Sequence, residues 1–441
     1  MRAELPLPAL ESMQAEPGVR PDLVDEAADP ELETLRAAVR RCADALVGTA
    51  FTDRDRAGWL SWELTADGRP TTMRGGNPAL YDGDSGNAYA CALLGVALDR
   101  SDLVDLAVRA GRHALRRSSQ LDPGLLGGRA GVELAVHRIE GLTGERIEGG
   151  QSAGRWGAPG RRTGSGESSL PDATQRGGPD LTDGLAGELY AAAALGARQA
   201  MLQQLIDELG SRAVPGPVGL SWSDPTADPR PLCGLAHGAS GIAFAVAEAG
   251  ACRPELAPAA RRLAGGALAW ERAWFDPIRG SWPDLRSDSL SYPAWWCHGA
   301  AGIGLVRLRL LSLQRVGVDL GLSEPALLAE ASAAIRAGSA ELARAVAAGG
   351  HSAGLTLCHG AGGSLELLLR AAEVLGVDEH RRLAVRFAAA LVPGLDDDPR
   401  QWPTGLPVIG GGGLFLGLAG TAAVLARLAF PQRELAGVAL L

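Results

Sequence analysis

The sequence predicts an all-α chain folded as an α/α toroid, in which seven helical hairpins form an inner and an outer ring of helices. Two observations support this fold class. A Gly-x-x-Gly motif followed by an apolar stretch occurs seven times, and amphipathic segments with charged residues on one face alternate with these stretches. Segments with the period-2 alternation of β-strands are not found, which argues against a sheet.

The apolar stretches that follow the seven motifs are predicted to be the inner helices. They are rich in small residues, which allow neighbouring helices to approach closely. One Gly-x-x-Gly is a weak signal, but seven copies whose first glycines are 45 to 61 residues apart are a strong one. The motifs begin at Gly83, Gly128, Gly184, Gly238, Gly299, Gly360 and Gly417.

The amphipathic segments are predicted to be the outer helices, at residues 33–49, 101–118, 199–213, 255–276, 324–348 and 377–392. We expect the hairpins to close into a ring and not to stack as an open solenoid. The terminal units lack a polar capping repeat, and the seventh inner segment is as apolar as the others.

The alternation of expected inner and outer helices is interrupted between the second and third motifs. Residues 142–179 are rich in Gly, Ser, Arg and Pro where an outer helix is due, which predicts a mobile insertion; the alternative is a peptide-contacting flap with Trp156 at its tip. The predicted organisation is a flexible extension over 1–30, one toroid domain over 31–430 and a C-terminal tail over 431–441.

Composition restricts the class of protein. The chain has 441 residues, 46% hydrophobic and 21% charged, with 60 Gly and 27 Pro that follow no strict period, which excludes disorder and collagen. All 42 basic residues are arginine and the net charge is −9. No basic stripe with interleaved aromatics is present, so nucleic-acid binding is not expected.

The chain is expected to be cytoplasmic and without a transmembrane segment. Its N-terminus has no apolar stretch behind a basic start, as a secretory signal would. The segment from Gln401 to Ala426 has no charged residue and is long enough to cross a bilayer. It nevertheless contains seven glycines and two prolines and includes the seventh motif, which favours a buried helix.

Residues with catalytic chemistry collect directly before the motifs. If the inner helices run parallel around a ring, these residues converge at one face although they are far apart in sequence. Two cysteines stand one residue earlier still, at Cys297 and Cys358, whereas Cys42, Cys91, Cys233 and Cys252 share no register and are expected to be buried fillers. The position before each first glycine holds Asp82, Gly127, Asp183, His237, His298, His359 and Leu416.

Cysteine and histidine at helix N-termini predict a zinc site. A thiol there has a lowered pKa, and a metal would deprotonate it. Three protein ligands leave a fourth position open, as catalytic zinc requires, and thiolate-rich ligation would keep a substrate thiolate nucleophilic. The alternative is that the two Cys-His pairs are merely buried and hydrogen-bonded. His237 shares the ring position and is a candidate acid or base.

Three tryptophans stand 15 to 17 residues before a motif, namely Trp222, Trp282 and Trp402. They belong to the loops that enter the inner helices. Rigid aromatic rings in these loops would either grip a peptide at the rim of the site or fill gaps between hairpins.

The set of seven motifs with Trp296-Cys-His-Gly299, Leu357-Cys-His-Gly360 and Leu235-Ala-His-Gly238 resembles the lanthionine synthetase C-like (LanC-like) cyclase family, over roughly residues 30–430. The resemblance implies an α/α toroid with zinc held by Cys297, Cys358 and His359. It also implies addition of a cysteine thiol to dehydroalanine or dehydrobutyrine in a precursor peptide, which forms lanthionine or methyllanthionine rings.

The resemblance assigns further residues. His237 matches the family's active-site histidine, and the family's aspartate fits Asp180, which would orient His237, with Asp183 as the rival candidate. Some members have an arginine four residues before the first zinc cysteine, where this chain has Pro293. Other members have Tyr where this chain has His298. We expect His298 to act as a second proton donor.

The implied partners are a dehydrated precursor peptide and a separate dehydratase, since only about 30 residues precede the first expected helix. Three alternatives stay open. The first is a related enzyme that adds glutathione to dehydroamino acids, and the second is a non-catalytic peptide-binding scaffold stapled by zinc. The third is a glycosidase, which rests on fold analogy alone because the acids Asp82, Asp183 and Asp284 form no convincing pair.

Overall fold

A helix begins directly after the first glycine of each motif in a computed structural model of the chain, which describes residues 29–64, 70–148, 177–224, 230–349, 354–404 and 411–440. The first glycine of each motif is the N-cap of its helix, in extended conformation. These inner helices are α2 (Asp84–Leu98), α4 (Arg129–Thr143), α6 (Leu185–Ala194), α8 (Ala239–Cys252), α10 (Ala300–Arg315), α12 (Ala361–Leu375) and α14 (Leu418–Ala429).

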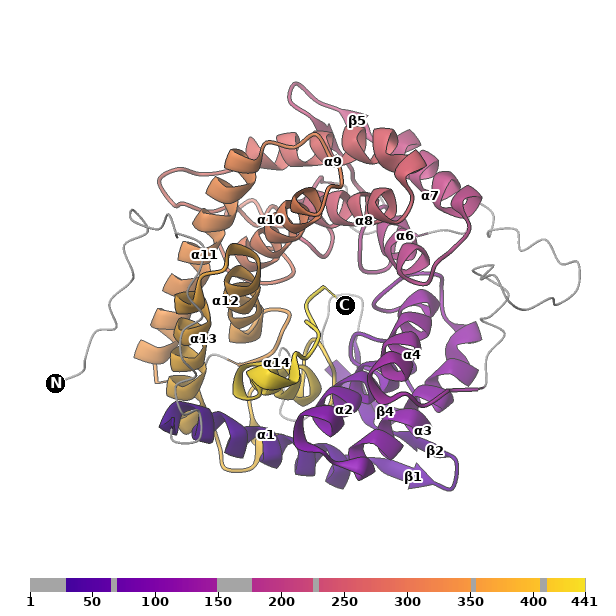
Figure 1. Cartoon of the computed structure of the whole chain (residues 1–441), viewed down its shortest axis with the longest axis vertical. Coiled ribbons are helices and arrows are strands. Elements are labelled where there is room, and N and C mark those ends of the chain that lie inside the picture. Colours follow the sequence, from indigo (N-terminus) through magenta and orange to yellow (C-terminus); the bar gives the residue numbers. More distant parts are fainter. Residues whose placement is uncertain are drawn as a thin grey trace, which may run out of the picture.

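The outer helices surround this inner ring (Figure 1). Helix α14 packs against both α1 and α2, so the last hairpin meets the first and the ring is closed. The predicted α/α toroid is therefore confirmed. The described outer helices are α1 (Pro30–Thr49), α3 (Ser101–Arg117), α7 (Gln199–Ser211), α9 (Ala257–Arg272), α11 (Glu324–Ala347) and α13 (Asp378–Leu391).

The predicted insertion over 142–179 lies mostly outside the described residues. Helix α4 ends at Thr143, and the described chain stops at residue 148 and resumes at residue 177. The expected insertion and the alternative flap around Trp156 therefore both fall outside the residues that the structure describes, and so does the N-terminal extension before Asp29.

Close backbone approach explains why the motifs require glycine. A Cβ on Gly131 would overlap the carbonyl oxygen of Leu125, and a Cβ on Gly302 would overlap that of Trp296. The turn before each helix folds back on the helix start, which leaves no room for a side chain. In every unit the first helical N–H donates to the carbonyl seven residues earlier, as Ala300 N does to Pro293 O at 3.1 Å. Pro293 thus caps α10 through its backbone.

A belt of backbone hydrogen bonds joins the seven turns. In each turn, one backbone carbonyl belongs to the residue two positions before the first glycine. This carbonyl accepts a hydrogen bond from a backbone N–H of the turn before it in the ring. The N–H of Trp296, for example, donates to the carbonyl of Cys358 at 3.0 Å. The belt is closed because Cys358 N donates to Phe415 O at 3.0 Å and Phe415 N donates to Tyr81 O at 2.9 Å. Distant parts of the sequence are therefore held in one register.

Buried ion pairs connect helices of the inner ring to helices of the outer ring. Arg307 of α10 is fully buried and donates to Glu271 of α9 at 2.7 Å and to Glu330 of α11 at 2.6 Å. It also donates to Ser240 of α8 at 2.9 Å, while the second oxygen of Glu271 accepts from the backbone N–H of Gly234 at 2.8 Å. This network ties four helices to the turn that carries His237.

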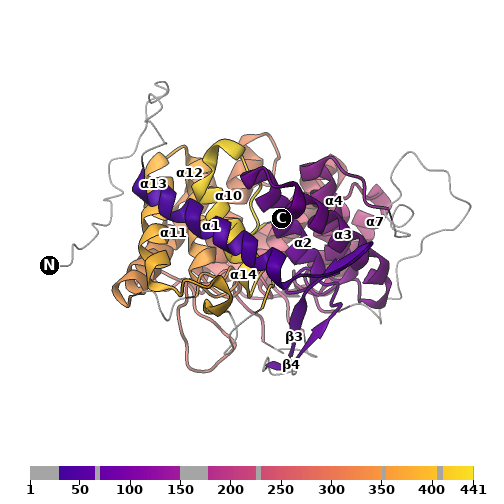
Figure 2. The same ribbon diagram turned by 90° about the horizontal axis from the view of Figure 1, so that it is seen from below.

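The described part of the chain also has three short antiparallel strand pairs at the edge of the ring, which the sequence did not predict. The first two, β1 (Phe51–Asp53) with β2 (Arg56–Gly58) and β3 (Leu60–Leu64) with β4 (Pro70–Gly75), follow α1. The third pairs β5 (Val214–Pro215) with β6 (Leu220–Ser221). Figure 2 shows β3 and β4 projecting from one face of the ring. The strands are too short for a period-2 pattern to stand out.

The residues expected as a C-terminal tail pack inside the ring, where Figure 1 places the C-terminus. Val438 and Ala439 are buried, and the indole N–H of Trp296 donates to the carbonyl of Ala439 at 2.9 Å. The uncharged stretch from Gln401 leads into α14, and none of the described helices is both long and apolar enough to span a membrane. One minor expectation is wrong: Cys252 is exposed, because it lies at the end of α8.

Candidate metal centre and active site

One cavity of about 470 Å³ lies where the inner helices begin. Six of the seven ring positions before the motifs line it, and the seventh, Leu416, lines a small neighbouring pocket. Because the inner helices are parallel and start at this face, their positive dipole ends all point toward the cavity. The six lining positions are Asp82, Gly127, Asp183, His237, His298 and His359.

A cluster of metal-ligating side chains forms part of the cavity wall. The ligand atoms of Cys297, Cys358 and His359 all lie within 4.8 Å of one another, and Sγ of Cys297 is 4.0 Å from Nδ1 of His359. Tetrahedral zinc with Zn–S bonds of about 2.3 Å holds its ligand atoms about 3.5–3.8 Å apart, so the three side chains fit zinc after a small contraction. Among the described residues this is the one such cluster of three or more.

The two thiols differ in their tendency to ionise. A hydrogen bond with the Cys358 thiol holds the pKa of Cys297 well below its ordinary value, while burial raises the pKa of Cys358 well above its own. The pair therefore retains one proton between its two sulfurs, which a metal ion would displace. The neighbouring His359 ring also favours the Cys297 thiolate.

Tyr81 supports the cluster from the first turn of the ring, which is joined to the Cys358 turn through Phe415. Its hydroxyl donates to Sγ of Cys358 at 3.2 Å, and its ring stacks on Phe415 with centroids 5.3 Å apart. Burial raises the pKa of Tyr81 well above its ordinary value, so the phenol stays a hydrogen-bond donor. Such a partner fixes the orientation of a ligating thiolate. Tyr81 stands two residues before Gly83, the same register as the two cysteines, so that register was the signal that could have revealed it.

His237 is paired with Asp180. Its Nδ1 lies 2.8 Å from Oδ2 of Asp180, and its ring is 41% exposed. Burial opposes the imidazolium, but the hydrogen bond and charge of Asp180 outweigh it and raise the pKa of His237 above 6.5. Burial likewise opposes the Asp180 carboxylate, and the pairing with His237 lowers its pKa nonetheless. The hydroxyl of Thr182 lies 3.0 Å from the same Nδ1.

The rival aspartate has a different role in the structure. Oδ1 of Asp183 accepts from the backbone N–H of Gly127 at 3.0 Å, in the neighbouring turn. Burial and the nearby charge of Asp180 raise the pKa of Asp183. The hydrogen-bond geometry therefore pairs His237 with Asp180, whereas Asp183 joins two turns of the belt.

His298 is buried and stacks on His237, with ring centroids 5.5 Å apart and planes 19° from parallel. Its Nδ1 has no hydrogen-bond partner among the described residues. Burial lowers the pKa of His298 to about 4, so the ring is neutral at pH 7. A neutral imidazole is a poor proton donor, which argues against the expected role of His298 as a second acid.

Arg286 also lines the cavity, and no motif pointed to it. Its Nη2 and Nε donate to the buried carboxylate of Asp284 at 2.6 and 3.0 Å. Its side chain is 44% exposed, and its Nη1 has no hydrogen-bond partner among the described residues. A guanidinium held this way presents a fixed donor to the cavity. Arg286 thus places a guanidinium at the wall of the cavity, whereas Pro293 has no charged group.

The loop tryptophans are buried among the hairpins and do not rim the metal cavity. Trp222, Trp282 and Trp402 are all at most 5% exposed. The indole N–H of Trp222 donates to Leu209 O at 2.8 Å, and that of Trp402 donates to Asp396 O at 2.7 Å. None of the three lines the metal cavity.

Comparison with known proteins places the chain in a family. The model of the lanthionine synthetase C-like proteins matches residues 76–440. The chain belongs to the lanthionine synthetase C-like family. The match begins after α1 and the first two strand pairs and includes the buried C-terminal residues, so it is shifted from the 30–430 that the motifs indicated.

One solved structure agrees with the fold of a LanC-like protein. Nisin cyclase is similar over 81% of this chain and 89% of its own, with a TM-score of 0.56 and 15% identity. A possible member of the GH105 family from Klebsiella pneumoniae covers 98% of this chain and 100% of its own at 14% identity, with a TM-score of only 0.44. No curated protein matches the chain.

Proposed function

We propose that this LanC-like protein is a lanthipeptide cyclase that uses zinc to close thioether rings in a dehydrated precursor peptide. In this reaction the cysteine sulfur bonds to the β-carbon of dehydroalanine or dehydrobutyrine. The carbon–carbon π bond breaks, the thiol gives up its proton, and the α-carbon receives one. The observation that carries the proposal is that the Cys297, Cys358 and His359 cluster shares one cavity with the His237–Asp180 pair.

Cys297, Cys358 and His359 would hold the zinc ion, which when bound supplies the substrate cysteine as a thiolate at neutral pH. Two observations support the fit. The three ligand atoms lie within 4.8 Å of one another, and three protein ligands leave a tetrahedral position for a substrate sulfur. Tyr81 would hold the Cys358 sulfur in place through its 3.2 Å hydrogen bond.

His237 is the group we assign to proton transfer. Asp180 raises its pKa, so a larger fraction of the ring is imidazolium near neutral pH. Nδ1 is held by Asp180, which leaves Nε2 as the atom that would protonate the α-carbon. The stacked, neutral His298 would keep the His237 ring in plane without competing for that proton.

Arg286 is the group we assign to charge stabilisation. When sulfur adds to the β-carbon, negative charge moves to the carbonyl oxygen of the dehydroamino acid. The Nη1 group of Arg286 could donate to that oxygen while Asp284 holds the other side of the guanidinium. The substrate must already be dehydrated at serine or threonine, and we expect a separate dehydratase to supply it.

The experiment uses the zinc-loaded protein and a synthetic peptide with one dehydroalanine and one cysteine. Ring closure leaves the peptide mass unchanged and removes its reactivity toward a thiol-alkylating reagent, both measured by mass spectrometry. Cys297→Ala and Cys358→Ala should lose zinc and turnover, whereas His237→Ala should keep zinc and lose turnover.

Other outcomes separate the alternatives. With glutathione present, a transferase would yield an intermolecular adduct of higher mass and no ring. A scaffold would lose thermal stability with its zinc and show no thiol addition in any variant. Either result would overturn the cyclase proposal.

A further inference from the structure

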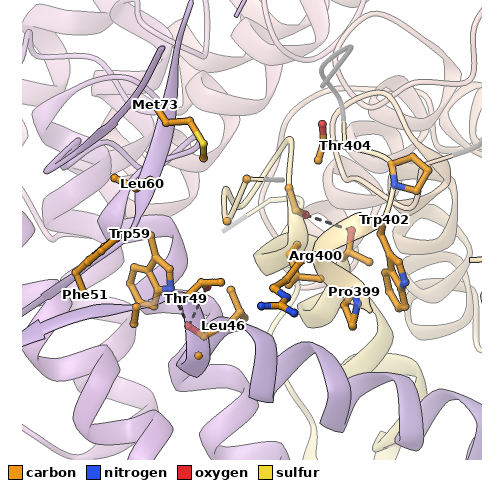
Figure 3. Close-up of a pocket in the computed structure, with 18 residues that line it drawn as sticks. Leu46, Thr49, Phe51, Trp59, Leu60, Met73, Pro399, Arg400, Trp402 and Thr404 are labelled. Atoms are coloured by element: carbon orange, nitrogen blue, oxygen red, sulfur yellow. Dashed lines mark hydrogen bonds between the residues drawn. The ribbon is translucent and has the colours of Figure 1, made fainter. Parts of the chain in front are cut away.

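An apolar groove lies beside the metal cavity, at the same face of the ring. Its volume is about 350 Å³, within the range of small-ligand pockets, roughly 300–1,000 Å³. Figure 3 shows its two walls, one from the end of α1 and the strands that follow it and the other from the segment around Trp402. Phe51, Trp59, Leu60 and Met73 stand in the first wall, opposite Pro399 and Trp402.

Large apolar side chains are unusually exposed around this groove. Phe51 is 61% exposed, and Leu60 and Met73 are each 37% exposed. These are three of the nine exposed large hydrophobic residues in the described chain, and all three line the one groove. Apolar surface gathered in a concave site marks a binding site more often than scattered residues do.

The groove is nearly uncharged. Among the described residues that line it, the one charged residue is Arg400, whose guanidinium is already paired with Asp398 at 2.7 Å. The described walls therefore offer nothing that would select an anion. A groove of this size has room for only a few side chains. A stable interface between two protein chains buries a much larger surface, about 1,200 Å² or more. A peptide segment suits it better than a second copy of the chain.

The groove continues toward the metal cavity. A small pocket between them shares Thr404, Gly411, Gly412 and Gly417 with the groove. The same small pocket shares Asp82 with the metal cavity. The small pocket therefore adjoins both the groove and the metal cavity through residues that it shares with each of them.

We propose that this groove binds an apolar segment of the peptide substrate while its cysteine lies in the metal cavity. The proposal rests on the proposed function for the identity of the peptide, and on the groove itself for the apolar preference. The groove would then select peptides with two or three large apolar residues at a fixed distance from the reacting cysteine. It would hold them through burial of apolar surface, with little dependence on salt.

The test uses fluorescein-labelled synthetic peptides with one cysteine and one serine, which bind without reacting. One carries Leu-Phe-Leu to one side of the cysteine, a second carries it to the other side, and a third has Ser-Gln-Ser instead. Fluorescence anisotropy with the zinc-loaded protein should show about ten-fold tighter binding of one apolar peptide over the polar one.

The variants Phe51→Ser and Met73→Ser, combined, should abolish this preference and leave binding of the polar peptide unchanged. Both side chains are exposed enough for the protein to stay folded, which circular dichroism checks. The matched control combines Ile278→Ser and Val316→Ser, which are 93% and 75% exposed and line neither the groove nor the cavity. The control should keep the ten-fold preference.

Equal binding of all three peptides to the wild type would overturn the proposal, as would an equal loss in the control. A dimer in sedimentation velocity that dissociates only in the groove variant would assign the groove to a second copy and overturn it too. The dehydrated versions of the peptides separate the two proposals. Ring closure without apolar preference rejects the groove alone, and apolar preference without ring closure rejects the cyclase alone.

Discussion

Replacing Asp180 with asparagine should lower the pKa of His237. The carboxylate contacts Nδ1 at 2.8 Å, and charge-assisted hydrogen bonds contribute about 1.5–3 kcal/mol. The His237 ring is 41% exposed, so screening by water should reduce this contribution to about 1 kcal/mol.

Asparagine keeps the other contacts of this side chain. Oδ1 of Asp180 accepts from the backbone N–H groups of Asp183 and Gly184 at 2.9 and 3.0 Å, which an amide oxygen can also do. The amide NH₂ would then face Nδ1 of His237 and favour the neutral ring. The matched control is Asp183→Asn, whose carboxylate bonds to Gly127 and not to the histidine, so its effect on the pKa should be smaller.

The assay is an NMR titration of the His237 ring in zinc-loaded protein, assigned with a His237→Gln variant. The same pKa should appear in the pH profile of ring closure. Because His237 must be protonated to donate, activity is lost as pH rises through its raised pKa, and Asp180→Asn should move that loss to lower pH. An unchanged pKa in Asp180→Asn, or a larger shift in Asp183→Asn, would refute the pairing.

Three further predictions concern other parts of the ring. Arg286→Gln should lower kcat about 100-fold, the usual effect of removing one donor to a developing oxyanion, with zinc content by elemental mass spectrometry unchanged. Arg307→Met should destabilise the protein by about 3–5 kcal/mol in urea unfolding, because it leaves the buried carboxylates of Glu271 and Glu330 without their cation. A midpoint equal to the wild type would contradict this. Burial raises the pKa of Asp84 to about 7, so its contribution to stability is lost as pH rises from about 4 to about 7. Asp84→Asn should therefore gain stability relative to the wild type across this range, and a constant difference between the two would contradict that reasoning.

The sequence was sufficient to predict the ring and to single out residues that the structure brings together at one face. Each Gly-x-x-Gly motif marks a backbone turn that folds back onto the start of its own helix. A Cβ atom at the glycine would overlap a carbonyl oxygen there. Because the same turn recurs seven times, residues at one register position had to lie at one face. Cys297, Cys358, His359 and His237 could therefore be singled out without knowledge of any contact between them.

Contacts between turns required the tertiary structure. Arg286 lies in an irregular loop, where neither period nor spacing marks a residue that points into the cavity. The choice of Asp180 over Asp183 depended on a hydrogen bond between neighbouring turns, and the neutral state of His298 depended on its burial. The apolar groove joins residues from the two ends of the chain, which meet only because the ring closes. The register of the seven turns is set by steric contacts between residues close in sequence, so the sequence repeat reveals it. Ionisation states, loop side chains and cavities depend on atoms brought together by closure of the ring, which local sequence does not encode.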